Sequence, residues 1–207
     1  MIGKFIVIEG QDATGKDTQA QLLADYLRKQ GKTVVHYAES GTASPDPFVA
    51  KIAKLNYGSS QDIDHRTRVL LYIVNRYEQW RKLAEPALRR NEIVITTRSW
   101  YSTLIYEGYA GGVDVDLIVK LHKLVMPEMY FHPDKAVIMT LSDKDRKKRL
   151  EAQGKRKVEV FKSMSPDFHR LLNESYLKVA KDFAVPTLDA GGSPEKVNEK
   201  LIKLFNL

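Results

Sequence analysis

Residues 4–18 (KFIVIEGQDATGKDT) constrain the fold of this chain more than any other stretch. Residues 5–8 form a short apolar run rich in β-branched side chains, which predicts a strand buried on both faces. Gly10 follows this strand, Gly15-Lys16 comes after four further residues, and residues 19–28 have a helical pattern. The stretch therefore predicts a strand and a helix joined by a glycine loop.

This arrangement is typical of a phosphate-binding P-loop, in which backbone N–H groups and the helix N-terminus hold phosphate oxygens. It predicts a nucleoside triphosphate site, with an ordinary glycine-rich turn as the alternative. Lys16 supplies a positive charge for the outer phosphates. The residues expected to contact the nucleotide are Gly10, Gln11, Asp12, Ala13, Thr14, Gly15, Lys16, Asp17 and Thr18.

The 207 residues fit a single domain spanning 1–207. The chain has no cysteine, which excludes disulfides and thiolate metal sites and is compatible with a cytoplasmic location. No apolar run approaches the roughly 20 residues of a membrane span, and the predicted first strand begins too early to follow a signal peptide. The formal charge of +7 could suggest nucleic acid. A small anionic substrate needs the same field, and the basic residues are dispersed outside 144–157, so we expect no nucleic-acid partner.

Strand and helix patterns alternate along the chain. Strands are predicted at residues 5–8, 32–37, 92–96, 135–141 and 185–188, and helices at 19–28, 48–55, 62–90, 114–125, 165–183 and from 194 onward. A helix capped by Ser142 is expected between the fourth strand and residue 165. This alternation predicts an α/β fold, with a five-stranded parallel sheet flanked by helices on both faces.

The predicted helix 62–90, with Asp62 as its cap, carries Arg68, Tyr72, Arg76 and Trp80 at intervals of four residues, so these side chains share one face. Arginines flanking an aromatic ring suit a planar polar ligand, because the ring stacks and the arginine donates hydrogen bonds. An amphipathic helix with solvated arginines is the alternative.

Two further basic features suggest phosphate contacts. Arg98 follows the third strand at its carboxyl end, where it can grip a phosphate, although a surface arginine explains the position equally well. Residues 144–157 are the densest basic stretch, and such a run is often only a solvated face.

Taken together, the chain resembles the thymidylate kinase family from end to end. The resemblance rests on residues 5–16, on the run LLYIVNR at 70–76, on Arg98 followed by Ser102, Tyr106 and Gly108, and on Leu188-Asp-Ala. It implies a P-loop kinase of the nucleoside monophosphate kinase type, with a short basic lid at about 150–162. The implied reaction is ATP·Mg²⁺ plus dTMP giving ADP plus dTDP, and the family is typically homodimeric.

The resemblance also implies roles for individual residues. Tyr72 would stack on thymine, Arg76 would donate to its carbonyl oxygen, and Arg98 would hold the dTMP phosphate. Asp12 would lie near the 3′-hydroxyl and the metal. On the substrate side the resemblance further places Glu39, Arg68, Ser102 and Tyr106, with Tyr106 against the sugar carbon that carries a hydroxyl in ribonucleotides. Members of the family carry an arginine either in the P-loop or in the lid, and residues 11–15 contain none. The resemblance therefore implies that Arg149 and one of Arg156 or Lys157 reach ATP from the lid side.

Three positions depart from the family pattern. Asp17 stands where a hydroxyl binds the metal, and Thr97 replaces the aspartate that precedes the phosphate-gripping arginine. These two look like an exchange, so we expect the Mg²⁺ shell to keep one carboxylate and one hydroxyl, from Asp17 and Thr97. The family's acceptor-phosphate arginine is missing around Glu39, and Arg68 is the candidate replacement.

Two rival functions remain: a deoxynucleoside kinase or a kinase of another dNMP, and a protein that binds nucleotide without catalysis. A deoxynucleoside kinase also uses a P-loop and an Arg-Ser pair, and it would need a carboxylate base, for which Glu9 is the obvious candidate. Alternatively, the altered metal positions could leave a protein that binds nucleotide without turnover.

Overall fold

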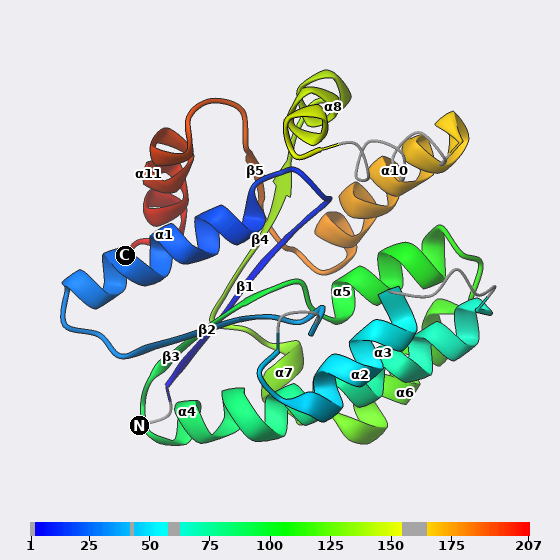
Figure 1. Cartoon of the computed structure of the whole chain (residues 1–207), viewed down its shortest axis with the longest axis horizontal. Helices are drawn as coiled ribbons and strands as arrows, with labels where there is room; N and C mark the ends of the chain where they lie inside the picture. The colour runs from blue at the N-terminus through cyan, green and yellow to red at the C-terminus, as the bar shows by residue number, and fades with distance from the viewer. Residues whose placement is uncertain (1–2, 42–43, 58–62, 155–164) are drawn as a thin grey trace.

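The computed structural model describes residues 3–41, 44–57, 63–154 and 165–207. The strands are β1 (Lys4–Gly10), β2 (Val34–Ala38), β3 (Ile93–Thr97), β4 (Lys135–Thr140) and β5 (Thr187–Asp189). They form one sheet of order β2-β3-β1-β4-β5, and every pair is parallel (Figure 1). The predicted five-stranded parallel sheet is confirmed.

Helices connect the strands. They are α1 (Lys16–Lys29), α2 (Pro47–Tyr57), α3 (His65–Gln79), α4 (Glu85–Arg89), α5 (Trp100–Thr103), α6 (Val115–Val125), α7 (Glu128–Phe131), α8 (Asp143–Ala152), α10 (Pro166–Asp182) and α11 (Pro194–Phe205), with π-helical turns η1 (Trp80–Ala84) and η2 (Leu104–Tyr109). No helix within the described ranges is both long enough and apolar enough to cross a membrane.

The helices cover both faces of the sheet. On one face, α1 and α11 pack Leu23 and Leu201 against Ile6 and Ile8 of β1. The helices α3, α6 and α10 lie on the other face, where the apolar cluster includes Phe5 of β1 (Figure 1). Side chains of β1 thus alternate between two apolar layers, which explains why residues 5–8 read as a continuous apolar run.

The predicted helix 62–90 is present with two differences. Its cap is Asp64 rather than Asp62, which lies outside the described residues; the Asp64 side chain accepts a hydrogen bond from the backbone N–H of Arg66. The helix also widens into the π-turn η1 before continuing as α4. Pro86 has no N–H to donate to the preceding turn, which accounts for irregular hydrogen bonding just before it.

The loops that carry the predicted site all leave the same edge of the sheet. β1 ends at Gly10 and β3 at Thr97, so their carboxyl ends meet, and Ile8 pairs with Thr97 in the register. β2 lies beside β3 with Ala38 opposite Thr97, which brings Glu39 to this edge as well. Parallel strands therefore bring the phosphate-binding loop, Arg98 and Glu39 together from distant parts of the sequence.

Candidate active site

The loop between β1 and α1 has the backbone of an anion cradle. Ala13 and Gly15 have φ values of 67° and 90°, which turn successive N–H groups toward one side. At Gly10, an added Cβ would lie 2.7 Å from Thr14 Oγ1, so only glycine fits there. In the described structure no side chain caps the start of α1, which leaves its first N–H groups available to a phosphate.

Lys16 is buried at the bottom of this loop between two carboxylates. Its Nζ lies 3.4 Å from Asp12 Oδ1 and 3.5 Å from Asp17 Oδ2. Burial and the nearby Arg98 lower the pKa of Lys16, while the two carboxylates oppose this shift. The lysine is therefore held in place by groups that phosphates can replace.

Arg98 reaches the same carboxylate from β3. Its Nη2 lies 2.6 Å from Asp12 Oδ1, and its charge holds the pKa of Asp12 well below its usual range. Its Nη1 donates to Ser102 Oγ at 3.1 Å and to Tyr176 Oη at 3.4 Å. The backbone of Arg98 has φ of 69°, an uncommon conformation for a non-glycine residue and one found often at functional sites. Two cations, one at the start of α1 and one directly after β3, thus converge on Asp12.

Tyr106 and Tyr176 line the other side of Arg98. The guanidinium carbon of Arg98 lies 5.4 Å from the Tyr106 ring centroid, and the rings of Tyr106 and Tyr176 meet edge to face at 6.3 Å. Tyr106 was predicted near the sugar, but Tyr176 was not predicted at all. The sequence around Tyr176 predicts only an amphipathic helix. Its contact with Tyr106 depends on how α10 packs against η2, which is distant in the sequence.

Asp17 and Thr97 contact each other directly. Thr97 Oγ1 donates to Asp17 Oδ1 at 2.7 Å, from the end of β3 to the first turn of α1. Burial raises the pKa of Asp17, but Lys16 and the Thr97 hydroxyl outweigh this effect and lower it. A carboxylate and a hydroxyl, the donor types of the predicted metal shell, therefore lie together beside Lys16.

Arg76 is buried and held by several groups. Its Nε donates to Glu39 Oε2 at 2.6 Å, its Nη2 to the Ser99 carbonyl at 2.7 Å, and its Nη1 to Thr103 Oγ1. Tyr130 Oη donates to Glu39 Oε1 at 2.8 Å. The solvated-arginine alternative is therefore wrong for Arg76. Glu39 contacts this arginine rather than open solvent, and burial raises the pKa of Glu39 to about 7.

Tyr72 lies beside this buried cluster, whereas Arg68 points elsewhere. The guanidinium carbon of Arg76 lies 5.2 Å from the Tyr72 ring centroid, and Tyr72 is only partly buried. Arg68 donates from Nη1 to the Asn56 carbonyl at 3.0 Å and from Nε to the Ile63 carbonyl at 3.3 Å. The structure thus brings Tyr72 and Arg76 together and directs Arg68 toward the end of α2.

Glu9 is a buried carboxylate behind Arg98. Its carboxylate accepts hydrogen bonds from the Ser99 N–H at 2.7 Å and from Ser102 Oγ at 3.0 Å, and Glu9 is 0% exposed. These bonds hold the turn that carries Arg98. Glu107 is also buried and pairs with His65 Nδ1.

Arg149 of α8 lies on the opposite side of the loop. It donates to the Thr14 carbonyl at 3.0 Å and to the Ala190 carbonyl at 2.8 Å. Thr14, Arg149, Ala190 and Pro194 are among the residues that line a cavity of about 340 Å³ next to the start of α1. Arg156 and Lys157 lie outside the described residues, as does most of the predicted lid.

This arrangement can hold two anionic ligands end to end. The cradle around Lys16, with the cavity beside Arg149, suits a nucleoside polyphosphate. Arg98 lies on the other side of Asp12 with the Tyr106 ring beside it, and a guanidinium of this kind suits a second phosphate. The meeting point of the two is next to Asp12, Lys16 and Arg98.

Comparisons with known proteins identify related chains. A family model for thymidylate kinase matches residues 8–201. A thymidylate kinase of Caldicellulosiruptor saccharolyticus is 33% identical over 207 residues, covering 100% of this chain and 97% of its own. A probable thymidylate kinase of Thermococcus onnurineus is 30% identical, covering 97% and 96%. The crystal structure of thymidylate kinase from Ehrlichia chaffeensis aligns over 100% of both chains, with a TM-score of 0.77 and 25% identity.

Proposed function

This chain belongs to the thymidylate kinase family, whose reaction is the phosphorylation of dTMP to dTDP, and we propose how its site divides that reaction between ATP and dTMP. The observation that carries the proposal is the convergence of two cations on Asp12: Lys16 Nζ lies 3.4 Å and Arg98 Nη2 2.6 Å from the same oxygen. A γ-phosphate next to Lys16 and a dTMP phosphate next to Arg98 would meet there.

The ATP side consists of the phosphate-binding loop and Arg149. The β- and γ-phosphates would accept from the loop N–H groups and from Lys16, replacing its contacts with Asp12 and Asp17. The cavity of about 340 Å³ beside Arg149 would receive the adenine ring. Arg149 already bridges Thr14 and Ala190, so it would form one wall of that site.

The dTMP side consists of Arg98 and the aromatic residues beyond it. Arg98 would donate to the phosphate, Ser102 and Tyr106 would lie along the deoxyribose, and Tyr72 would stack on thymine. Arg76 already donates to several protein groups. For this reason we assign most of the contact with thymine to the partly buried Tyr72. Arg76 would donate a hydrogen bond to a single carbonyl oxygen of the base.

The transfer itself requires little covalent chemistry from the protein. An oxygen of the dTMP phosphate attacks the γ-phosphorus of ATP in line, the bond from that phosphorus to the bridging oxygen breaks, and ADP leaves with the electron pair. The attacking group is already an anion, so no strong base is needed. Lys16 and Arg98 would offset the charge on the transferred group, and Asp12 would orient Arg98.

Mg²⁺ would be held by Asp17 and Thr97. Mg²⁺ is typically bound by one or two protein oxygens together with phosphates and water. The described residues contain no group of three or more His, Cys, Asp and Glu side chains that could hold a metal. The adjoining Asp17 carboxylate and Thr97 hydroxyl provide a donor set of the right type. The bound metal would screen phosphate charge.

The deoxynucleoside kinase alternative is not favoured by the site. That reaction needs a carboxylate base that can reach a hydroxyl of the acceptor. Glu9 is fully buried and accepts from the Ser99 backbone and from two serine hydroxyls. Its environment is that of a carboxylate that supports the Arg98 turn.

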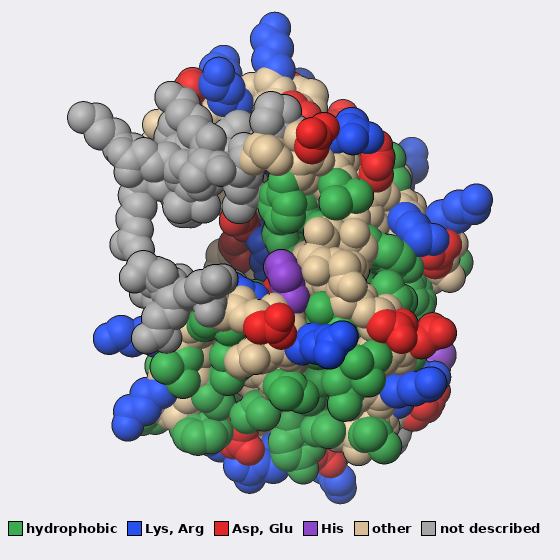
Figure 2. All heavy atoms as spheres, turned by 90° about the vertical axis from the view of Figure 1, so that its right-hand side faces the viewer, with side chains coloured by type: hydrophobic (Ala, Val, Ile, Leu, Met, Phe, Trp, Pro, Cys, Tyr) green, Lys and Arg blue, Asp and Glu red, His purple; other side chains and the backbone are tan. Residues whose placement is uncertain are grey.

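We also propose a homodimer in a cytoplasmic setting. Leu70, Val74 and Tyr77 form an exposed apolar row along α3, and Leu124 of α6 is 81% exposed. The face drawn in Figure 2 has a broad gathering of hydrophobic side chains in its lower half. An apolar surface of this kind supports an interface with a second copy of the chain.

The test is an ADP-release assay with each of the four dNMPs and with thymidine, with and without Mg²⁺. We expect turnover to be fastest with dTMP and to require Mg²⁺. Turnover of thymidine but not of dTMP would support the deoxynucleoside kinase instead. Binding of ATP without any ADP release would indicate a non-catalytic nucleotide-binding protein.

A further inference from the structure

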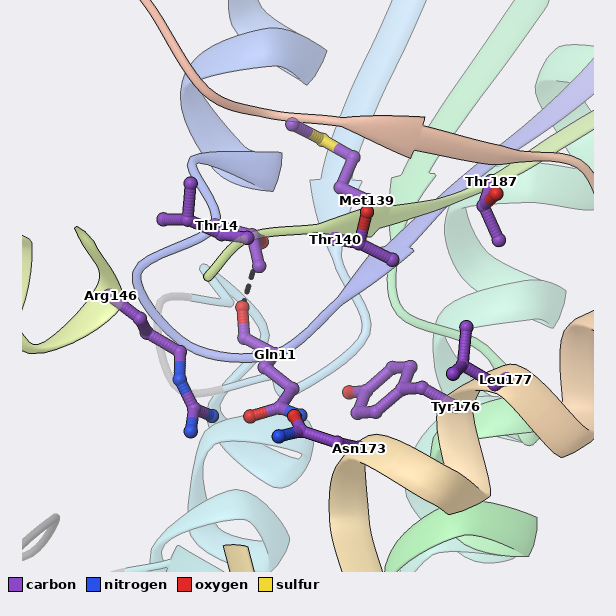
Figure 3. A pocket seen from close by; sticks show the side chains of 10 residues that line it. Gln11, Thr14, Met139, Thr140, Arg146, Asn173, Tyr176, Leu177 and Thr187 are labelled. Atoms are coloured by element: carbon purple, nitrogen blue, oxygen red, sulfur yellow. Dashed lines mark hydrogen bonds between the residues drawn. The ribbon is translucent and has the colours of Figure 1, made fainter. Parts of the chain in front are cut away.

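We propose that Gln11 and Asn173 act as positioning residues that hold the phosphate-binding loop for the adenine nucleotide, an inference that rests on the proposed function. Gln11 belongs to the loop, and Asn173 belongs to α10, more than 150 residues later in the chain. The Gln11 side-chain amide donates from Nε2 to Asn173 Oδ1. Figure 3 shows the two amide groups meeting below the loop.

The contact continues from α10 to α8. Asn173 Nδ2 donates to the two carboxylate oxygens of Asp143 at 3.4 and 3.2 Å. Arg146 Nη2 donates to Asp143 Oδ1 at 2.7 Å, and Arg146 is 4% exposed. The loop is therefore linked through polar side chains to both helices that border residues 155–164.

Packing alone does not hold the Gln11 side chain. Gln11, Met139, Asn173 and Tyr176 are among the residues lining a cavity of about 260 Å³ beside the loop (Figure 3). A side chain next to such a space has fewer packing contacts than one in a filled core. The hydrogen bond to Asn173 therefore decides where the Gln11 side chain lies.

Gln11 also has an unfavourable feature for a purely structural residue. It is 7% exposed, and its Oε1 is buried with no hydrogen-bond partner in the described part of the chain. A buried acceptor left without a donor destabilises the folded state, and an apolar side chain of similar size avoids that cost. The presence of a polar side chain at such a position indicates a role other than stability.

Gln11 is next to Asp12, and the Gln11 carbonyl accepts from Thr14 Oγ1 at 2.8 Å across the loop. A displaced Gln11 would therefore shift the loop N–H groups that face the phosphates. The expected result of breaking the link is weaker binding of ATP and ADP with little effect on dTMP.

The experiment is a double-mutant cycle of Gln11→Leu and Asn173→Leu in the full chain. ADP affinity is measured by calorimetry, KM for ATP and for dTMP by turnover, and stability by thermal unfolding. Each single variant should weaken ADP binding about five-fold, the scale of one neutral hydrogen bond. The double variant should bind ADP as the singles do, because both break the same link. KM for dTMP should not change, and Gln11→Leu should unfold at the same temperature as the wild type or higher.

Gln21→Leu is the matched control, because Gln21 makes a similar amide contact to Asp25 on the exposed side of α1. It should leave ADP affinity unchanged. Unchanged ADP affinity in the single variants, or five-fold effects that multiply in the double variant, would overturn the proposal. If Gln11→Leu does not fold, Asn173→Ser decides by the same ADP measurement. Loss of dTMP turnover in the wild type would refute the proposed function instead, since ADP binding does not depend on the acceptor.

Discussion

Exchanging Asp17 and Thr97 gives the sharpest test of the metal shell. The two side chains share a 2.7 Å hydrogen bond, and a hydrogen bond to a charged group contributes about 1.5–3 kcal/mol. Asp17→Ser removes this charge and leaves two hydroxyls. Thr97→Asp places two carboxylates side by side, and at about 4 Å and an effective dielectric constant of about 20 they repel by about 4 kcal/mol. The double exchange restores one carboxylate and one hydroxyl with their positions reversed.

These magnitudes predict the order of the variants in stability and in metal affinity. Without metal, the thermal stability of the double variant should be close to that of the wild type, with Asp17→Ser lower and Thr97→Asp lowest. Mn²⁺ binding in the presence of ADP, followed by electron paramagnetic resonance, should be weakest for Asp17→Ser and should recover in the double variant. The Mg²⁺ concentration that gives half-maximal ADP release should follow the same order as Mn²⁺ affinity.

Additive effects would contradict this reasoning. If the double variant is as destabilised as the two singles combined, the residues do not share one metal shell. The hypothesis that the two metal ligands have exchanged positions is also refuted if Asp17→Ser alone raises activity and Thr97→Asp adds nothing to that gain. Gln21→Ser is a suitable control, because Gln21 is an exposed residue of α1 whose amide contacts Asp25.

Three further predictions test other parts of the proposal. Arg98→Lys should lower kcat/KM for dTMP by about 10²–10³, because a lysine cannot reproduce the planar guanidinium contacts; an effect confined to KM for ATP would contradict the assignment. Glu39→Gln should remove a pH dependence of stability. Burial raises the pKa of Glu39 from 4.5 to about 7, so the folded state keeps a proton that the unfolded state loses, and wild-type stability should fall by about 3 kcal/mol as the pH rises through this range. Urea unfolding at pH 4.5 and 7.5 should show that fall in the wild type and not in Glu39→Gln, and a wild-type rise would show that Arg76 dominates. Leu124→Asp should convert the dimer to a monomer in sedimentation experiments, whereas an unchanged mass would place the interface elsewhere.

Local patterns predicted the elements of this fold because each pattern has a local cause. The apolar run at 5–8 and the loop with Gly15-Lys16 were sufficient for the first strand, the phosphate-binding loop and the helix after it. The alternation of elements was sufficient for a parallel sheet. The order of the strands depends on which strand lies beside β1, and short-range periodicity contains no information about that.

The candidate site was only partly predictable for the same reason. The four-residue spacing placed Tyr72 and Arg76 together, but it could not indicate that Glu39 from another strand would bury Arg76. Tyr176 was missed because its contacts with Arg98 and Tyr106 depend on how α10 packs. The exchange of Asp17 and Thr97 was inferred from two departures at known motif positions, and the structure places those two side chains in contact.

The two carboxylates that flank Lys16 bear on the form in which ATP enters. Before any nucleotide is present, Asp12 and Asp17 lie close to Lys16 and offset its positive charge. Uncomplexed ATP, with its full negative charge, would meet both acids at close range, whereas a metal-complexed nucleotide carries less charge and gives Asp17 a cation to bind. We therefore expect the entrance to favour the magnesium complex of ATP over the free polyanion, so excess chelator should inhibit turnover even when ATP is saturating.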